Sequence, residues 1–232
     1  MKKNRIFRVA AFLLIAVMIT TCTISGTFAK YVTSDTADDT ARVAKWGVEV
    51  VVTGDDAFGA KYNDAIVADG TKVVSANGTD KVLAPGTNGT LTTIEISGSP
   101  EVMVNVACNV TLTLSNWTAS YINGEGENVN GEDKCPVVFV VTVDGAQTTF
   151  KIDGTNTDSA KLAAAVEKAI EDAINRNNVS ANTPLAKNVS VTWAWAIDGN
   201  DEYDTALGDL AADGVSVPGI NFAITVSATQ VN

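Results

Sequence analysis

One segment of seventeen residues constrains the fold of this chain more than any other. It runs from Glu101 to Trp117 and reads EVMVNVACNVTLTLSNW. Its even-numbered positions from Val102 to Leu114 are apolar, and most of its odd-numbered positions are polar. Because side chains alternate between the two faces of a strand, this pattern predicts one face in a core and one in water. At about 3.3 Å per residue the segment would overrun a small sheet, so we expect it to bend, bulge or join two sheets.

The rest of the chain predicts further short strands and one clear helix. Asp158 is a good N-cap for an amphipathic helix over about 158–176, and a short second helix could run from Asp204 to Gly214. Strands are expected at 43–53, 72–76, 91–96, 137–143, 147–152, 189–197 and 220–231. Many short strands separated by turn residues predict an all-β, antiparallel sandwich with one inserted helix.

Charge and the lack of histidine limit the function classes. The formal net charge is −11 and the chain contains no histidine. A chain this acidic repels nucleic acids and anionic membrane surfaces, so we expect no nucleic-acid partner. Without histidine, the usual Ser-His-Asp and Cys-His nucleophiles and histidine zinc sites cannot form. None of the 27 acidic residues forms a distinguished pair, and we therefore expect no enzyme.

The N-terminus has the features of a secretory signal peptide. A basic start, an apolar stretch at about 9–19 and the sequence Thr27-Phe28-Ala29 predict a secretory signal over 1–29, cleaved between Ala29 and Lys30. The alternatives are a retained membrane anchor and a lipid on Cys22. Cleavage would leave a polar leader over 30–42 and a single sandwich domain over 43–232. We expect a secreted protein, in the extracellular matrix or at the cell surface, that meets the membrane only through its signal.

Two groups of residues are considered next: an acidic connection that could bind a cation, and a pair of cysteines that could form a disulfide. The acidic connection with Asp198, Asp201 and Asp204 is the candidate for calcium, although it lacks EF-hand spacing. We expect no disulfide between Cys108 and Cys135. In a simple hairpin they would lie roughly 30 Å apart, whereas a disulfide needs Cα atoms within about 7 Å.

Trp193 and Trp195 share one face of a predicted strand. One interpretation is a bulky pair in the core, and the other is a stacking platform for glycans. The second interpretation would make the protein a monomeric module that binds glycans or another surface.

The segment GTFAKYVTSDTADDTARVAKW, Gly26–Trp46, resembles the SipW-dependent signals of Gram-positive secreted proteins. The best-known of these proteins form the TasA and camelysin family of biofilm-matrix fibre subunits. SGSPEVMVNV, CPVVFVV, WAWAIDGNDEYDTALG and VSATQV resemble uncharacterised secreted proteins with the same type of leader. Camelysin has been described as a metallopeptidase, but this chain has no His-Glu-x-x-His motif.

The resemblance implies a jelly roll and a structural role in a fibre. The protein itself would be the main partner, as a homopolymer, together with other matrix or cell-wall components. The N-terminal segment would complete the sheet of the next subunit by β-strand donation. The residues that carry this role would be Tyr31, Val32, Val43, Trp46 and Val48.

Overall fold

The long alternating segment forms strand β5, Val104–Ser115, in the computed structural model of the chain, which describes residues 42–54, 56–63 and 71–231. The side chains on its even face are at most 7 % exposed from Val104 to Leu112, as the alternation predicts. The strand ends at Asn116, which takes the left-handed conformation with φ of 60°. The next strand belongs to a separate two-stranded sheet, so the predicted bend lies at Asn116.

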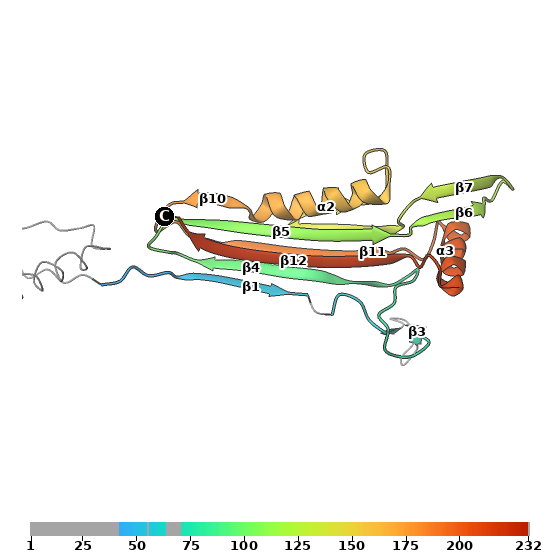
Figure 1. Cartoon of the computed structure of the whole chain (residues 1–232), viewed down its shortest axis with the longest axis horizontal. Coiled ribbons are helices and arrows are strands. Elements are labelled where there is room, and N and C mark those ends of the chain that lie inside the picture. Colours follow the sequence, from blue (N-terminus) through green and yellow to red (C-terminus); the bar gives the residue numbers. More distant parts are fainter. Residues whose placement is uncertain (1–41, 55, 64–70, 232) are drawn as a thin grey trace, which may run out of the picture. The chain divides into compact units, whose positions relative to one another are not determined.

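Two antiparallel sheets form the sandwich (Figure 1). The five-stranded sheet has the order β1-β4-β11-β8-β9. Its strands are Val48–Thr53 (β1), Asn88–Gly98 (β4), Lys187–Trp195 (β11), Val137–Val143 (β8) and Ala146–Phe150 (β9). The three-stranded sheet has the order β10-β5-β12, where β10 is Arg176–Val179 and β12 is Gly219–Gln230. The prediction of an all-β antiparallel sandwich is confirmed.

Helix α2, Ser159–Ile174, extends the smaller layer of the sandwich. The Asp158 carboxylate accepts a hydrogen bond from the backbone N–H of Lys161 at 2.9 Å, which is the predicted N-cap. The apolar stripe of the helix is buried at Leu162, Val166, Ile170 and Ile174. The helix contacts β5 along its side and β8, β9 and β11 across the core. It therefore fills the position beside β5 that the four-residue strand β10 leaves open (Figure 1).

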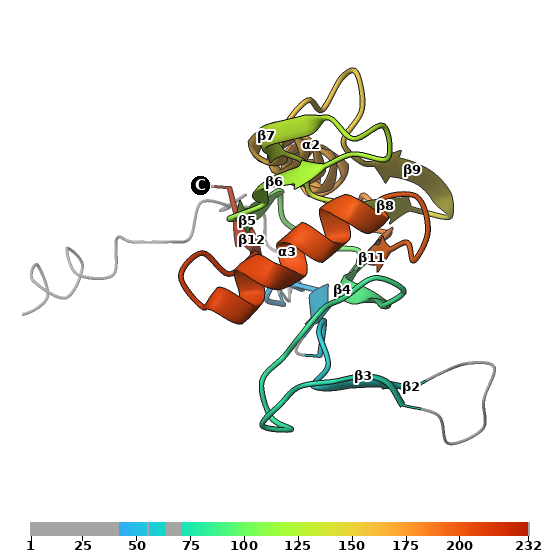
Figure 2. The same ribbon diagram turned by 90° about the vertical axis from the view of Figure 1, so that its right-hand side faces the viewer.

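A second helix and two hairpins complete the described residues. Helix α3, Asp201–Asp213, begins three residues before the expected Asp204 and ends at Gly214 with φ of 69°. Figure 2 shows α3 across one end of the sandwich, against the hairpin of β6 and β7. The hairpin strands are Thr118–Ile122 (β6), Asn128–Asp133 (β7), Lys61–Asn63 (β2) and Thr71–Val74 (β3). From the sequence alone, the Gly- and Asn-rich acidic stretch over 119–134 predicts a loop, whereas the structure forms the β6–β7 hairpin there.

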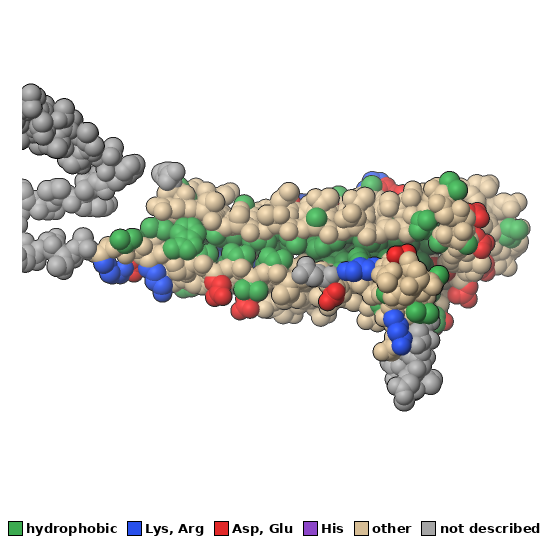
Figure 3. All heavy atoms as spheres, turned by 60° about the horizontal axis from the view of Figure 1, so that its bottom comes forward, with side chains coloured by type: hydrophobic (Ala, Val, Ile, Leu, Met, Phe, Trp, Pro, Cys, Tyr) green, Lys and Arg blue, Asp and Glu red, His purple; other side chains and the backbone are tan. Residues whose placement is uncertain are grey.

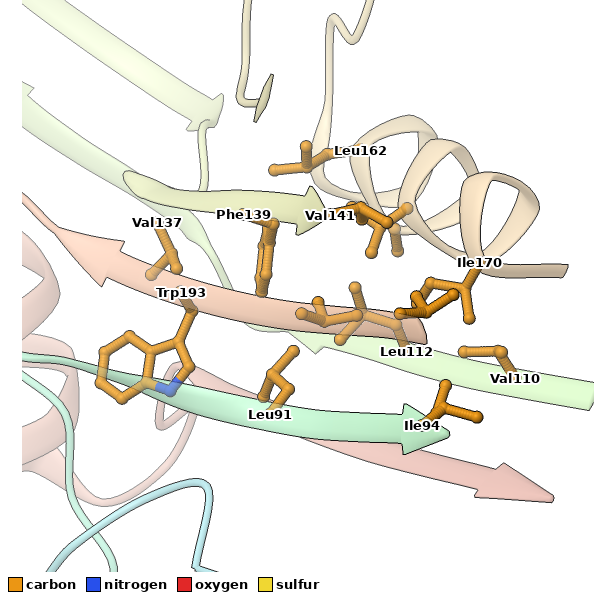
Figure 4. Packing of buried hydrophobic residues seen from close by; sticks show 14 of the residues in the cluster. Leu91, Ile94, Val110, Leu112, Val137, Phe139, Val141, Leu162, Ile170 and Trp193 are labelled. Carbon is orange, nitrogen blue, oxygen red and sulfur yellow. The ribbon is translucent and has the colours of Figure 1, made fainter. Parts of the chain in front are cut away.

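The core lies between the two layers (Figure 4). Leu91 and Ile94 of β4 and Phe139 and Val141 of β8 face the side chains of β5 and α2. The compact unit that contains this core runs from Ala44 to Asn232. The finer prediction of a jelly roll stays a prediction. None of the helices in the described ranges is long and apolar enough to span a membrane.

Candidate functional site

The outer edge of β12 has no neighbouring strand among the described residues. In β5, the backbone N–H groups of Cys108, Val110 and Leu112 donate toward α2, so the even residues of β5 point their backbone away from β12. Val110 lies opposite Ile224 in the β5–β12 pairing. Residues that face each other in an antiparallel pair share the same hydrogen-bonding state. The even residues of β12 therefore direct their N–H and C=O groups to the open edge.

The composition of β12 leaves this edge unprotected. Its twelve residues, GINFAITVSATQ, include no charged residue and no proline. Edge strands normally carry charges, prolines or bulges, because unpaired backbone groups recruit other strands. A long, uncharged edge is therefore a template for an added strand.

The inner face of β12 is only partly buried. Ile220, Phe222, Ile224, Val226 and Ala228 alternate inward, and all five remain partly accessible. The equivalent row of β5 is nearly inaccessible from Val104 to Leu112. On this side β12 faces the outer strand β1, where the inward Val52 is itself 39 % exposed. The inward side chains of β5 are therefore covered by the opposite sheet and helix α2, and those of β12 are only partly covered.

A groove lies between β1 and β12, and we call it the β1–β12 groove. It encloses about 210 Å³ and is lined by Val52, Gly54, Leu91, Thr92, Phe222 and Ile224. A more open cavity of about 420 Å³ shares Val52 and Gly54 with it. Figure 3 shows a band of hydrophobic side chains running lengthwise along this side of the sandwich.

The floor of the groove is preformed. The Thr92 hydroxyl is fully buried and donates to the backbone oxygen of Thr53 at 2.8 Å. A Cβ on Gly54 would lie 2.6 Å from the Leu91 oxygen, so only glycine lets the chain leave β1 this close to β4. The hydroxyl on the floor of the groove therefore already has an acceptor within its own chain.

Both tryptophans proposed as a glycan platform are buried. Trp193 is 1 % exposed, and its indole N–H donates to the oxygen of Ala57 at 2.9 Å. Trp195 is 6 % exposed and donates to the Asp204 carboxylate at 3.2 Å. Neither ring has a free face for a sugar, which contradicts the stacking interpretation and supports the core interpretation.

The calcium candidates do not converge. Asp201 and Asp204 lie in the first turn of α3, and Asp198 lies in the preceding turn. The Asp204 carboxylate is occupied by the Trp195 indole, and burial raises the pKa of Asp204. Within the described ranges, no three acidic or cysteine residues form a group that could hold a metal ion.

Cys108 and Cys135 are both free and buried. Burial is the main cause that raises the pKa of Cys108 to about 11 and that of Cys135 to about 12. Thiols with such values stay protonated at neutral pH and are poor nucleophiles.

Some of the residues predicted to donate a strand lie outside the described residues, and the others lie at or just before β1. The cleavage site at Ala29 and Lys30, together with Tyr31 and Val32, lies outside the described residues. Val43 is 91 % exposed and Trp46 is 40 % exposed. Val48 begins β1 and pairs with Gly98 of its own chain, so a donated segment would have to end before it.

Two hydrogen bonds hold the chain just before β1. Lys45 and Glu101 exchange them, from the Lys45 N–H to the Glu101 carboxylate and from the Glu101 N–H to the Lys45 oxygen, both at 2.9 Å. The Val231 N–H donates to Met103 at 2.9 Å. The start of β1 and the end of β12 therefore lie at the same end of the sandwich.

No protein-family model, curated protein or solved structure matched this chain in comparisons with known proteins. The groove residues were not singled out in the sequence analysis. The strand predicted over 220–231 alternates between apolar and polar residues, but the alternation could not show that the opposite sheet leaves it partly uncovered.

Proposed function

We propose that this protein is a secreted structural subunit of a cell-surface or biofilm-matrix fibre, and that it assembles by addition of a β-strand to the β1–β12 groove. The observation that supports the proposal is β12 itself. It is a twelve-residue edge without charge or proline, and its inward row is partly exposed. A strand added there would pair with the free backbone groups of β12 and cover its apolar side chains.

The donor in this proposal is the segment before β1 in a neighbouring copy. Residues 30–42 can reach up to roughly 45 Å when extended. Tyr31, Val32 and Val43 are its large apolar side chains, whereas Trp46 lies between Lys45 and Gly47, which are hydrogen-bonded to Glu101 and Ser99 of their own chain. Some of these would enter the groove against Phe222 and Ile224, and the backbone would supply affinity with little demand on the other side chains.

Donor and acceptor are different surfaces of the same subunit. An interface between two different surfaces leaves one of each free after every addition. Such heterologous contacts produce open filaments unless a rotation closes them into a ring. The proposal therefore describes a non-enzymatic homopolymer, and other matrix or cell-wall components would attach to its sides.

The test uses the mature protein, starting at Lys30, and two variants at one edge position. Val226 is an even residue, so Val226→Pro removes one outward N–H without touching the pairing with β5. Val226→Ala is the matched control, because it shortens the same side chain and keeps the N–H. Light scattering and electron microscopy report assembly, and circular dichroism reports the fold.

We expect filaments from the mature protein and from Val226→Ala, and folded monomers from Val226→Pro and from a deletion of residues 30–42. A mature protein that stays monomeric at high concentration would overturn the fibre. Filaments from Val226→Pro would show that β12 is not the acceptor. If the leader instead folds back into the groove of its own chain, the mature protein would be monomeric and the deletion would self-associate.

A further inference from the structure

Helix α2 contacts the backbone of β5 through side chains in place of a strand. The Leu112 N–H donates to Glu167 Oε1 at 2.6 Å, and the Val110 N–H donates to Glu171 Oε1 at 3.1 Å. The Cys108 N–H donates to Asn175 Oδ1 at 2.6 Å, just after the helix ends. These three acceptors are spaced at i, i+4 and i+8, so they lie along one face of the helix.

These contacts satisfy backbone donors along the part of β5 that β10 leaves unpaired. Strand β10 pairs with β5 only near Val104 and Val106. Beyond that point, alternate N–H groups of β5 would be unpaired and available to a strand of another molecule. The three side chains occupy these donors one by one, two of them as carboxylates, which are strong acceptors for backbone N–H groups.

The helix is held in place by a different set of residues. Leu162, Val166, Ile170 and Ile174 are at most 1 % exposed and pack into the core. The apolar stripe therefore anchors α2, and Glu167 and Glu171 contact the backbone of β5 from beside that stripe. The two roles can be separated by mutation.

We propose that Glu167, Glu171 and Asn175 exclude strand addition at β5, so that the three-stranded sheet offers one acceptor edge, β12, to another copy of this chain. The inference rests on the proposed function. The two neighbours of β5 then have opposite roles: strand β12 is uncharged and has an open outer edge, and helix α2 satisfies the β5 backbone with side chains. Assembly at one edge gives unbranched filaments, and assembly at two would give branched or laterally paired ones.

The test compares two double variants of the mature protein with equal charge. Glu167→Ala/Glu171→Ala removes both acceptors, and Glu167→Gln/Glu171→Gln removes the same charge but keeps a carbonyl oxygen at each position. Asp172→Ala is a further control, because Asp172 pairs with Lys168 on the exposed side of the helix (2.7 Å). Hydrogen exchange at Val110 and Leu112 reports the edge, and electron microscopy reports branching.

We expect exchange at Val110 and Leu112 to be on the order of tenfold faster in the alanine double variant, together with branched or laterally paired filaments. The glutamine double variant and Asp172→Ala should keep slow exchange and unbranched filaments. Faster exchange with unbranched filaments in the alanine double variant would overturn the proposal. Should that variant unfold, Glu171→Ala alone removes the longest of the three bonds and gives the same comparison.

The failure of this inference can be told apart from the failure of the fibre. If the mature protein is monomeric and the alanine double variant becomes dimeric, the proposed fibre function is wrong, and the proposed role of the α2 side chains is retained. If the mature protein forms filaments and all variants match it, the fibre stands and the role of α2 is wrong.

Discussion

At the scale of single residues, Tyr203 joins three elements at one end of the sandwich. Its side chain is 2 % exposed on α3. The hydroxyl donates to the backbone oxygen of Trp117 and accepts from the Lys134 N–H at 3.1 Å. These partners lie at the two ends of the β6–β7 hairpin. Among the described residues this hairpin is a two-stranded sheet of its own. Burial raises the pKa of Tyr203, so the hydroxyl stays protonated and can keep donating.

Tyr203→Phe should lower the free energy of unfolding by about 1–3 kcal/mol, because it removes at once the hydrogen bonds of the hydroxyl with Trp117, Lys134 and Glu132. Urea unfolding followed by circular dichroism measures the change. Tyr121→Phe is the matched control. Its hydroxyl donates to the Glu132 carboxylate at 2.7 Å in a more accessible place, and we expect less than about 1 kcal/mol there. Equal losses in both variants would contradict the role assigned to Tyr203.

The buried thiols give a residue-scale prediction for alkaline pH. Burial raises the pKa of Cys135 from 9.0 to about 12. Between these values the unfolded chain loses the proton and the folded chain keeps it, so stability is present below pH 9 and is lost as pH rises toward 12. Cys135→Ala should therefore lose less stability than the unmodified protein between pH 8 and pH 10, by on the order of 1 kcal/mol. Parallel urea curves at the two pH values test this, and identical losses would contradict it.

At the scale of elements, hydrophobic periodicity correctly predicted the strands and the helix that have one whole face buried in the core. The even row of β5 and the stripe of α2 both lie in the core, and the Asp158 cap was readable from the sequence. Strand β10 and the β6–β7 hairpin were missed, because their polar residues have no apolar period. The contacts of Glu167 and Glu171 were also missed, since a carboxylate beside an apolar stripe normally faces water.

Strand β1 depends on a close approach of two backbones. Gly98 of β4 has a φ of +117°, and a Cβ there would lie 1.9 Å from the Gly47 oxygen, just before β1. Gly98→Ala should therefore destabilise the protein by about 2–5 kcal/mol and speed hydrogen exchange in β1. Gly145→Ala is the control, because Gly145 has a φ of +88° but no atom within 4 Å of a Cβ. Its cost should be that of the backbone strain alone, about 1–2 kcal/mol. Thermal unfolding of both variants decides between the two causes.

At the scale of the whole sandwich, the two sides of β5 differ in how the sheet ends. On one side, α2 supplies acceptors to Cys108, Val110 and Leu112. On the other side, β12 pairs with β5 and leaves its own outer backbone free. A sequence shows that β5 and β12 alternate in the same way, but it cannot show which of them the opposite sheet covers. That depends on β1 having six residues where β12 has twelve.

The last prediction concerns the occupant of the β1–β12 groove. A synthetic peptide of residues 30–47 should bind the protein that begins at Ala44 with one peptide per chain, because the open edge of β12 pairs with one strand. Isothermal titration calorimetry measures the stoichiometry, and nuclear magnetic resonance should place the largest shifts at Phe222, Ile224 and Val226. The same peptide in excess should shorten filaments of the mature protein by occupying its acceptor edges. A peptide with proline at alternate positions has the same length and cannot donate to β12, so it should do neither. Equal binding of the peptide to the Val226→Pro variant would show that it binds elsewhere, and the groove would then need another occupant.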